Sequence, residues 1–487
     1  MDEIAQKKKN LEDLRAEGVD PYPNDFRPLH TTEEIHSRYG AKSREDLEKV
    51  EDTCVIAGRV MAIRGFGKAS FLTLQDRKGK IQVYIRRDDV GEEPYRIFKK
   101  LDIGDIIGVQ GKIFKTKTGE LTVEAQSFRL LAKSLRPLPE KWHGLRDVEI
   151  RYRQRSLDLI VSPHVREIFL KRTRLISSIR AFFNSKDFIE VETPMMQTIA
   201  GGAVARPFKT HHNALGIDLY LRIAPELYLK RLVVGGMERV YEINRNFRNE
   251  GLSTLHNPEF TMLEFYQSYA TYEDLMDLTE ELFCTLAYDL CGGLTFPYQG
   301  HTIDLTKPWK RVSLDDAVMS SCQVDRNTIT SRETMARLLH DKEIPTKDEM
   351  TLGELLLLAF EKFVEPRLIE PTFILGFPID VSPLARRNDK DRNKADRFEL
   401  FIAGMELANA FSELNDPQDQ RERFLSQLQE KREDIPQELD EDFLMAMEYG
   451  MPPTAGEGIG IDRLTMLFTD SASIREVVLF PLLRPEK

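Results

Sequence analysis

The chain has 487 residues and a formal net charge of −11, and a chain of this length is expected to form two or three domains. It has no apolar run long enough to cross a membrane, and its charged N-terminus has no apolar leader, so we expect a cytoplasmic protein with no membrane partner. The four cysteines form no CxxC pair, which favours free thiols over a disulfide framework or a zinc site.

Residues 1–146 predict a small β-domain behind an N-terminal helix that ends at Gly18. Five short strands, with a helix between the third and the fourth, are typical of an OB-fold barrel. Residues 54–133 hold 16 Lys and Arg against 9 Asp and Glu, so a basic module precedes an acidic remainder. This pattern predicts binding of single-stranded nucleic acid, although a lysine-rich solvated surface would give the same charge. The candidate base contacts are Arg64, Lys68, Phe71 and Gln82, unless Phe71 packs inside the barrel.

A proline-containing segment without periodicity, Ser134–Gly144, is the expected linker to the second domain. His164–Phe188 then shows helical spacing of apolar residues, and the following IEVETPMM predicts a strand that ends at Pro194. A second helix is expected to start near Pro225. Glu226 lies in its first turn, where a carboxylate is favourable even without a functional role.

The stretch FRNEGLSTLHNPEFTMLEFY, residues 247–266, carries charge into the centre of a predicted strand pair and has a long polar loop. If the strands are antiparallel, Arg248 faces Phe260, where an arginine can clamp a phosphate or carboxylate beside a stacked planar ring. Loop donors such as His256 could reach a polyphosphate. The alternative, a structural Arg248–Glu264 salt bridge, does not explain the length and polarity of the loop.

A second hairpin is predicted at residues 396–416, with Ala403 and Gly404 as its turn. This turn would pair residue 402 with 405 and residue 401 with 406, so that Glu399 and Glu406 come close enough to share Mg²⁺. Asn409, Phe411 and Glu413 share the other face by period 2. A β-bulge would be needed to bring them into the same pocket as Glu406.

The segment TAGEGIGIDRLTMLF, residues 454–468, combines three alternating glycines with Arg463 at an expected helix start. A glycine-rich turn into a helix is a modest signal for a phosphate site. The chain has neither the GxxxxGK[ST] motif of a P-loop nor a GxGxxG motif after a strand, so those nucleotide-binding folds are not expected.

These motifs together resemble the class II lysyl-tRNA synthetases of the bacterial type, over nearly the whole chain. FRNEGLSTLHNPEFTMLEFY resembles class II motif 2, GIGIDRLTMLF motif 3, and the helix with DFIEVETPMM motif 1. The resemblance implies an α+β fold, with an anticodon-binding OB barrel in residues 1–146 and an antiparallel sheet flanked by helices in residues 147–487. It also implies a helical insertion at about 306–350 and a homodimer formed through motif 1. Asp187 stands where motif 1 usually has glycine, and Asp tolerates a left-handed backbone well.

The resemblance further implies that the chain activates lysine with ATP and transfers the lysyl group to the 3′ end of its tRNA. Arg248 and Arg463 would be catalytic, and Glu399 and Glu406 would bind Mg²⁺. The implied ATP contacts are Arg248, Glu250, His256, Asn257, Phe260, Glu399, Glu406 and Arg463. The implied lysine contacts are Gly202, Glu226, Arg248, Glu264, Tyr266, Asn409, Phe411 and Glu413.

Three other readings compete with this one. A class II enzyme for aspartate or asparagine would need a basic residue in its side-chain pocket, where these positions are acidic. A relative that lysylates a protein typically lacks the N-terminal barrel. A non-enzymatic RNA-binding protein has no physical reason to retain Arg248, Arg463, Glu399 and Glu406 together.

Overall fold

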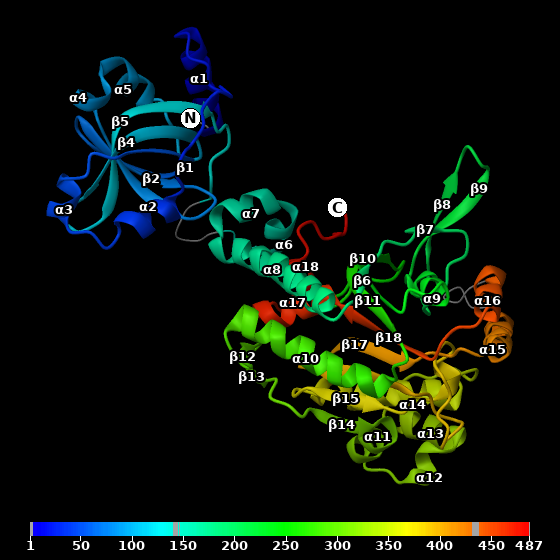
Figure 1. The fold of residues 1–487 in the computed structure, drawn as a ribbon. Coiled ribbons are helices and arrows are strands. Elements are labelled where there is room, and N and C mark those ends of the chain that lie inside the picture. The colour runs from blue at the N-terminus through cyan, green and yellow to red at the C-terminus, as the bar shows by residue number, and fades with distance from the viewer. Residues whose placement is uncertain (1–2, 140–144, 146, 431–437, 487) are drawn as a thin grey trace. The chain divides into compact units, whose positions relative to one another are not determined.

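The computed structural model describes residues 3–139, 145, 147–430 and 438–486. The chain forms two compact units, Met1–Arg146 and Asp147–Lys487 (Figure 1). Of the expected linker, residues 140–144 lie outside the described residues. Within the described part of the chain, no helix is both long enough and apolar enough to cross a membrane.

The N-terminal unit is a closed five-stranded barrel with the strand order β1-β2-β3-β5-β4. Two short helices lie between the third and the fourth strand, so the predicted OB-fold barrel is confirmed. The strands are β1 (Thr53–Phe66), β2 (Ala69–Gln75), β3 (Lys80–Arg86), β4 (Ile106–Lys115) and β5 (Leu121–Ala132). The helices are α1 (Glu3–Ala16), α2 (Thr32–Tyr39), α3 (Arg44–Glu48), α4 (Arg87–Val90) and α5 (Glu92–Phe98).

The second unit is built on an eight-stranded sheet in the order β14-β15-β16-β17-β18-β11-β10-β6. Its six central strands are antiparallel, as predicted, whereas the edge pairs β14–β15 and β6–β10 are parallel. In spatial order the strands are β14 (Lys310–Ser313), β15 (Thr372–Leu375), β16 (Arg397–Ile402), β17 (Met405–Ser412), β18 (Thr454–Gly460), β11 (Glu259–Ser268), β10 (Arg239–Phe247) and β6 (Ile189–Glu190).

The edge strand β6 is shorter than the sequence indicates, because regular pairing ends at Glu190 rather than at Pro194. Proline has no N–H to donate to a ladder, so the chain leaves the sheet before it. A separate small sheet in the order β7-β9-β8 follows, built from β7 (Met196–Gln197), β8 (Phe208–His212) and β9 (Ile217–Leu221).

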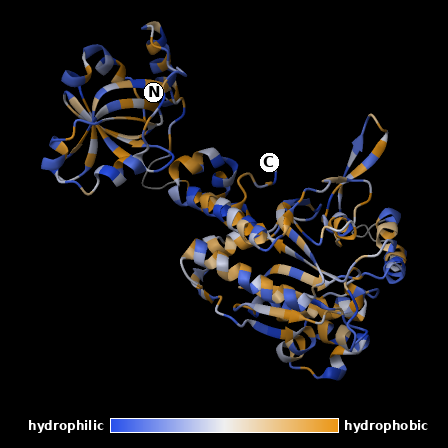
Figure 2. Ribbon diagram, viewed as in Figure 1, coloured by the Kyte–Doolittle hydropathy of each residue, from blue (hydrophilic) through white to orange (hydrophobic). Residues whose placement is uncertain are grey.

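One face of the large sheet carries the main hydrophobic core, beneath α8 (Pro163–Ser185), α10 (Tyr272–Cys291) and α17 (Ile461–Thr469). The strands present alternate residues such as Phe265, Leu400 and Ile459 to these helices. Hydrophobic and hydrophilic residues mix along α8 and α10, as expected of amphipathic helices (Figure 2). Asp187 follows α8 with φ = 64°, the left-handed conformation that glycine would otherwise supply. Because one face holds the core, the other face is left for polar chemistry.

The remaining helices pack against different parts of the unit, and the last of them adds Ile474 and Val477 to the main core. The helices between β14 and β15 form a separate hydrophobic core that also includes Phe401. The last of these helices, α14, begins at Leu352, beyond the insertion expected at about 306–350. Those helices are α11 (Leu314–Cys322), α12 (Arg326–Ile329), α13 (Arg332–Asp341) and α14 (Leu352–Phe363). The others are α6 (Val148–Arg153), α7 (Arg155–Val161), α9 (Glu226–Val234), α15 (Pro417–Glu430), α16 (Glu441–Glu448) and α18 (Ile474–Val477), and the hairpin is β12 (Thr295–Tyr298) with β13 (His301–Asp304).

Candidate active site

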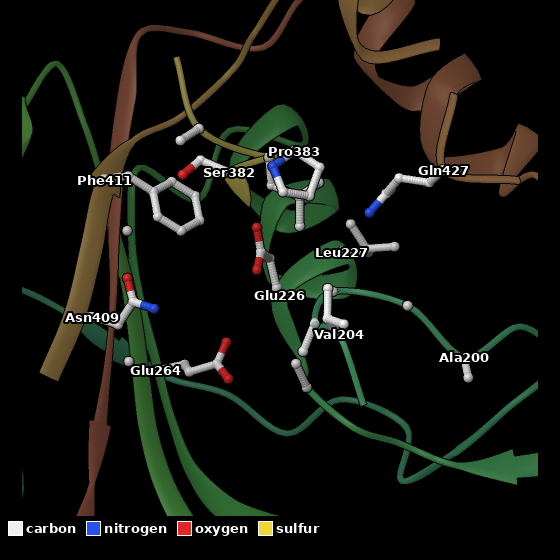
Figure 3. Close-up of a pocket in the computed structure, with 18 of the residues that line it drawn as sticks. Ala200, Val204, Glu226, Leu227, Glu264, Ser382, Pro383, Asn409, Phe411 and Gln427 are labelled. Carbon is white, nitrogen blue, oxygen red and sulfur yellow. The ribbon is translucent and has the colours of Figure 1, made fainter. Parts of the chain in front are cut away.

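Two adjoining cavities, of about 320 Å³ and about 180 Å³, lie on the face of the sheet opposite the main core. We call them the large cavity and the small cavity. Four residues line both of them, so a ligand can extend from one into the other: Arg248, Met262, Asn409 and Gly458. Figure 3 shows the large cavity, into which Glu226 points from α9 and Glu264 from β11, with Asn409 and Phe411 on β17.

Arg248 stands at the junction of the cavities because the predicted antiparallel pairing of β10 with β11 is confirmed. Its guanidinium lies over the ring of Phe260, 5.1 Å from the centroid. Its Nε is buried without a hydrogen-bond partner, and burial lowers the pKa of the guanidinium. Among the described residues Arg248 forms no ion pair with Glu264, so the alternative of a structural salt bridge fails. A buried arginine nitrogen without a partner is suited to an anionic ligand.

The alternating glycines of residues 454–468 lie in strand β18, and not in the expected turn. Gly456 lies opposite Tyr266, and Gly458 opposite Glu264. A Cβ on Gly456 would approach the Tyr266 ring to 2.3 Å, and one on Gly458 would approach the Met262 methyl group to 2.7 Å. The glycines therefore clear space for side chains of the site, and a direct phosphate contact is not needed to explain them.

Three buried carboxylates meet in or beside the large cavity: those of Glu226 at the start of α9, Glu264 on β11 and Glu413 just beyond β17. Burial raises the pKa of Glu264 to about 8, and the Tyr266 hydroxyl donates a hydrogen bond to its Oε2 at 3.5 Å. Lys230, one turn further along α9, pairs with Glu226 at 2.6 Å and also contacts Glu413. This cluster suits a ligand that carries ammonium groups.

The second hairpin has the predicted pairs, Ile402 with Met405 and Phe401 with Glu406. The next pair joins Leu400 to Ala408, so Leu407 is the extra residue of a β-bulge. The bulge shifts the alternation by one residue. As a result, Asn409 and Phe411 line the large cavity, and Asn409 and Glu406 line the small one. In a strand with regular alternation, Glu406 and Asn409 would lie on opposite faces of the sheet.

Glu406 lines the small cavity, and Glu399 lies close enough to it for the two charges to interact, so that they form an acidic pair. Burial, with a contribution from Glu406, raises the pKa of Glu399 to about 8. Arg397 donates to Glu399 Oε1 at 2.6 Å, and Arg463 lies 3.2 Å from Glu406 Oε2, so each carboxylate keeps a second oxygen for a hard cation. No group of three or more His, Cys, Asp or Glu among the described residues can hold a metal by itself. Two carboxylates fit Mg²⁺ whose remaining ligands are water and nucleotide phosphates.

The small cavity brings Phe260 together with Arg463 and the loop residues Glu250 and His256. Arg463 Nη2 lies 3.1 Å from His256 Nε2, and Ser253 Oγ lies 2.8 Å from His256 Nδ1. Arginine can only donate, so the neutral imidazole accepts at Nε2 and donates from Nδ1. Burial first, and then the nearby Arg463 charge, lower the pKa of His256, which favours that neutral form.

Two of the expected contacts also have a structural role within the chain. Asn257 lines the small cavity, but its amide donates to the carbonyl of Glu259 at 2.6 Å and accepts from the N–H of Leu482 at 3.3 Å. Gly202 borders the large cavity with φ = 88°, next to Glu226, so a side chain there would be strained and crowded.

On the barrel, Phe71 does not join the core; it lies on the outer surface beside Tyr84, at a centroid distance of 4.9 Å. The neighbouring rings Phe66 and Phe114 extend this pair into a row, at 6.0 Å from Phe71 and 6.1 Å from Tyr84. Arg64 lies opposite Phe71 in the ladder and is exposed, as is Lys68, whereas Gln82 accepts a hydrogen bond from Thr122 at 2.9 Å. An aromatic row beside basic groups is suited to stacking unpaired bases.

Sequence reasoning missed two site residues, Lys230 and Arg397. Arg397 donates from Nε to Asn409 Oδ1 at 3.1 Å as well as to Glu399, so it connects the large cavity to the acidic pair. For Lys230, the available signal in the sequence was its i,i+4 spacing from Glu226 on a predicted helix. The contacts of Arg397 depend on strand pairing and had no comparable signal.

Comparison with known proteins agrees with this architecture. Residues 147–484 match the family described as tRNA synthetases class II (D, K and N), and residues 54–131 match the OB-fold nucleic acid binding domain. The second unit is therefore a class II synthetase domain, and the chain belongs to that class.

Its relatives include the lysine–tRNA ligase of Carboxydothermus hydrogenoformans, 56% identical over 98% of this chain and 97% of the relative. Those of Pelotomaculum thermopropionicum and Thioalkalivibrio sulfidiphilus are 53% and 55% identical over 99% of this chain, and over 94% and 97% of the relatives. Within its class, the chain belongs to the lysine–tRNA ligase family.

Proposed function

We propose that this chain activates lysine with ATP and transfers the lysyl group to tRNA. The observation that carries the proposal is the position of Arg248, whose buried and unpartnered Nε lies where the two cavities join. An arginine at that point can hold the lysine carboxylate and the α-phosphate of ATP at once. The amino acid would occupy the large cavity and ATP the small one.

In the first step, a lysine carboxylate oxygen attacks the α-phosphorus, the new P–O bond forms and pyrophosphate leaves. In the second, a hydroxyl of the terminal tRNA adenosine attacks the acyl carbonyl, loses its proton and releases AMP. The carboxylate is already a nucleophile at neutral pH, so the first step needs positioning and charge neutralisation. Arg248 and Arg463 would supply both, with the adenine between Phe260 and Arg463. Glu250 and His256 would contact ATP in the same cavity.

Glu399 and Glu406 would hold Mg²⁺, which neutralises phosphate charge when bound. The tRNA would be read in part by the barrel, through Arg64, Lys68, Phe71 and Gln82 at its anticodon. We also propose a homodimer through α8 and β6, whose Leu170 and Ile189 are exposed apolar residues. Sedimentation equilibrium would test the homodimer, and a monomer at micromolar concentration would refute it.

The amino acid is selected by charge, because Glu226, Glu264 and Glu413 suit ammonium groups and disfavour a side-chain carboxylate. ATP–pyrophosphate exchange with all twenty amino acids tests the function directly. We expect exchange with lysine alone. Exchange with aspartate or asparagine would assign the chain to another branch of its class, and exchange with none would refute the activation step.

A further inference from the structure

Lys230 places a buried ammonium group behind the wall of the large cavity, against Glu226, which lines that cavity. Its side chain is completely buried, and its Nζ lies 2.6 Å from Glu226 Oε1 and in contact with Glu413 Oε2. Nζ also lies 5.5 Å from the centroid of the Phe411 ring. Burial alone would lower the pKa of Lys230, but Glu226 and Glu413 outweigh burial and raise that pKa, so the side chain is a cation.

The charges around the cavity can be compared with those of the amino acid. Three carboxylates, those of Glu226, Glu264 and Glu413, would face a substrate that carries only two ammonium groups. Arg397 does not balance the excess, because its guanidinium is held by Glu399 at 2.6 Å. Arg248 would pair with the substrate carboxylate. Lys230, which pairs with both Glu226 and Glu413, offsets the third negative charge.

We propose that Lys230 is a positioning residue that sets the charge of the amino-acid pocket to match the two ammonium groups of lysine. Its ammonium group holds the carboxylates of Glu226 and Glu413 together. Glu264 has no such cationic partner within the described ranges and therefore remains available to the substrate. This inference rests on the proposed function. It adds a residue that would shape affinity for the amino acid without touching the reacting atoms.

A purely structural ion pair explains the arrangement less well. Buried ion pairs are commonly replaced by apolar residues of similar volume with little loss of stability. Here the pair sits at the start of α9, where Glu226 and Leu227 both line the cavity. In the part of the chain that the structure describes, neither oxygen of the Glu413 carboxylate accepts a hydrogen bond, although Oε2 forms the ion pair with Lys230. A buried carboxylate whose oxygens accept no hydrogen bond retains the capacity for a further donor.

Lys230→Met removes the charge and keeps most of the volume, and Lys230→Gln keeps a donor without the charge. For both full-length variants we expect the KM for lysine in ATP–pyrophosphate exchange to rise at least about tenfold, the scale of one lost charged contact. The KM for ATP should stay within about twofold, because Lys230 lies outside the small cavity. Isothermal titration with lysine alone should show the same loss of affinity.

Lys133→Met is the matched control, because Lys133 is equally buried and pairs with Asp102 and Asp105 in the barrel. It should change thermal stability and leave the KM for lysine unaltered. The proposal is overturned if a folded Lys230 variant keeps the wild-type KM for lysine, or if both KM values rise together. If Lys230→Met does not fold, Lys230→Gln decides by the same criterion. Absence of lysine-dependent exchange in the wild type would refute the proposed function instead.

Discussion

Arg463 donates a hydrogen bond from Nη1 to the backbone carbonyl oxygen of Glu406 at 2.7 Å, and the same nitrogen lies 3.2 Å from the Glu406 carboxylate. The two residues are 57 positions apart, one on β17 and the other on α17. Their contact joins a candidate Mg²⁺ ligand to a candidate adenine contact. The orientation of one should therefore depend on the other.

Arg463→Lys tests this contact. Lysine keeps the charge but lacks the planar guanidinium group that lets arginine contact Glu406 and His256 at the same time. We expect kcat/KM for ATP in the exchange reaction to fall by at least ~2 kcal/mol, the scale of a hydrogen bond to a charged group. Arg421→Lys, at an exposed pair with Glu441, is the control and should leave the value unchanged. A wild-type value for Arg463→Lys would remove Arg463 from the nucleotide site.

Glu264→Gln addresses the amino-acid pocket. The variant keeps the shape of the side chain and removes a buried carboxylate that lacks a cationic partner among the described residues. We expect kcat/KM for lysine to fall by at least ~2 kcal/mol, with the KM for ATP little changed. Steady-state exchange at varied lysine measures both values. If kcat/KM for lysine is unaffected, Glu264 does not bind the substrate amine.

The same variant should alter how stability depends on pH. Burial raises the pKa of Glu264 from 4.5 to about 8, so the folded ligand-free chain binds this proton more tightly than the unfolded chain does. Its stabilising contribution is complete below pH 4.5 and is lost as the pH rises through about 8. Thermal melting of the wild type should therefore weaken over this range more than that of Glu264→Gln. Parallel pH profiles for the two proteins would contradict the shifted pKa.

The aromatic row on the barrel predicts that a substitution there affects the tRNA-dependent step and leaves amino-acid activation unchanged. Phe71→Ala should weaken tRNA binding by ~1–3 kcal/mol, the scale of one base stacked on an aromatic ring, and raise the KM for tRNA in aminoacylation. Exchange without tRNA should be unchanged, because the cavities lie in the other unit. Phe128→Ala, whose ring packs against Phe98 in the same barrel, controls for loss of stability. Equal KM values for tRNA in Phe71→Ala and wild type would rule out Phe71 as a base contact.

Removal of divalent cations tests the acidic pair. Chelation by EDTA should abolish exchange, and added Mg²⁺ should restore it. Glu399→Gln should raise the Mg²⁺ concentration needed for half-maximal activity by about tenfold, because one anionic ligand is lost. Full activity in excess EDTA would show that the reaction needs no divalent cation. An unchanged Mg²⁺ requirement in Glu399→Gln would exclude that carboxylate as a ligand.

Local pattern determined much of this protein. The barrel, the helix at residues 164–188 and the turn at Ala403 and Gly404 all follow from period, charge and turn residues within short windows. Pairing across a hairpin then follows from the alternation of its two strands, which is why the sequence alone predicts that Arg248 lies near Phe260. The resemblance of the motifs to those of class II synthetases indicated the class of enzyme.

Tertiary structure alone decided which of these parts meet. Three features depend on strand alternation or on packing between distant segments. They are the bulge at Leu407, the contacts of Arg397 with Glu399 and Asn409, and the pairing of Lys230 with Glu413. A shift of one residue moves a side chain to the opposite face, and a buried charge is tolerated only where its partner arrives from elsewhere in the chain. Neither condition is contained in a local stretch of sequence, so the charge balance of the pocket emerges only when the sheet is assembled.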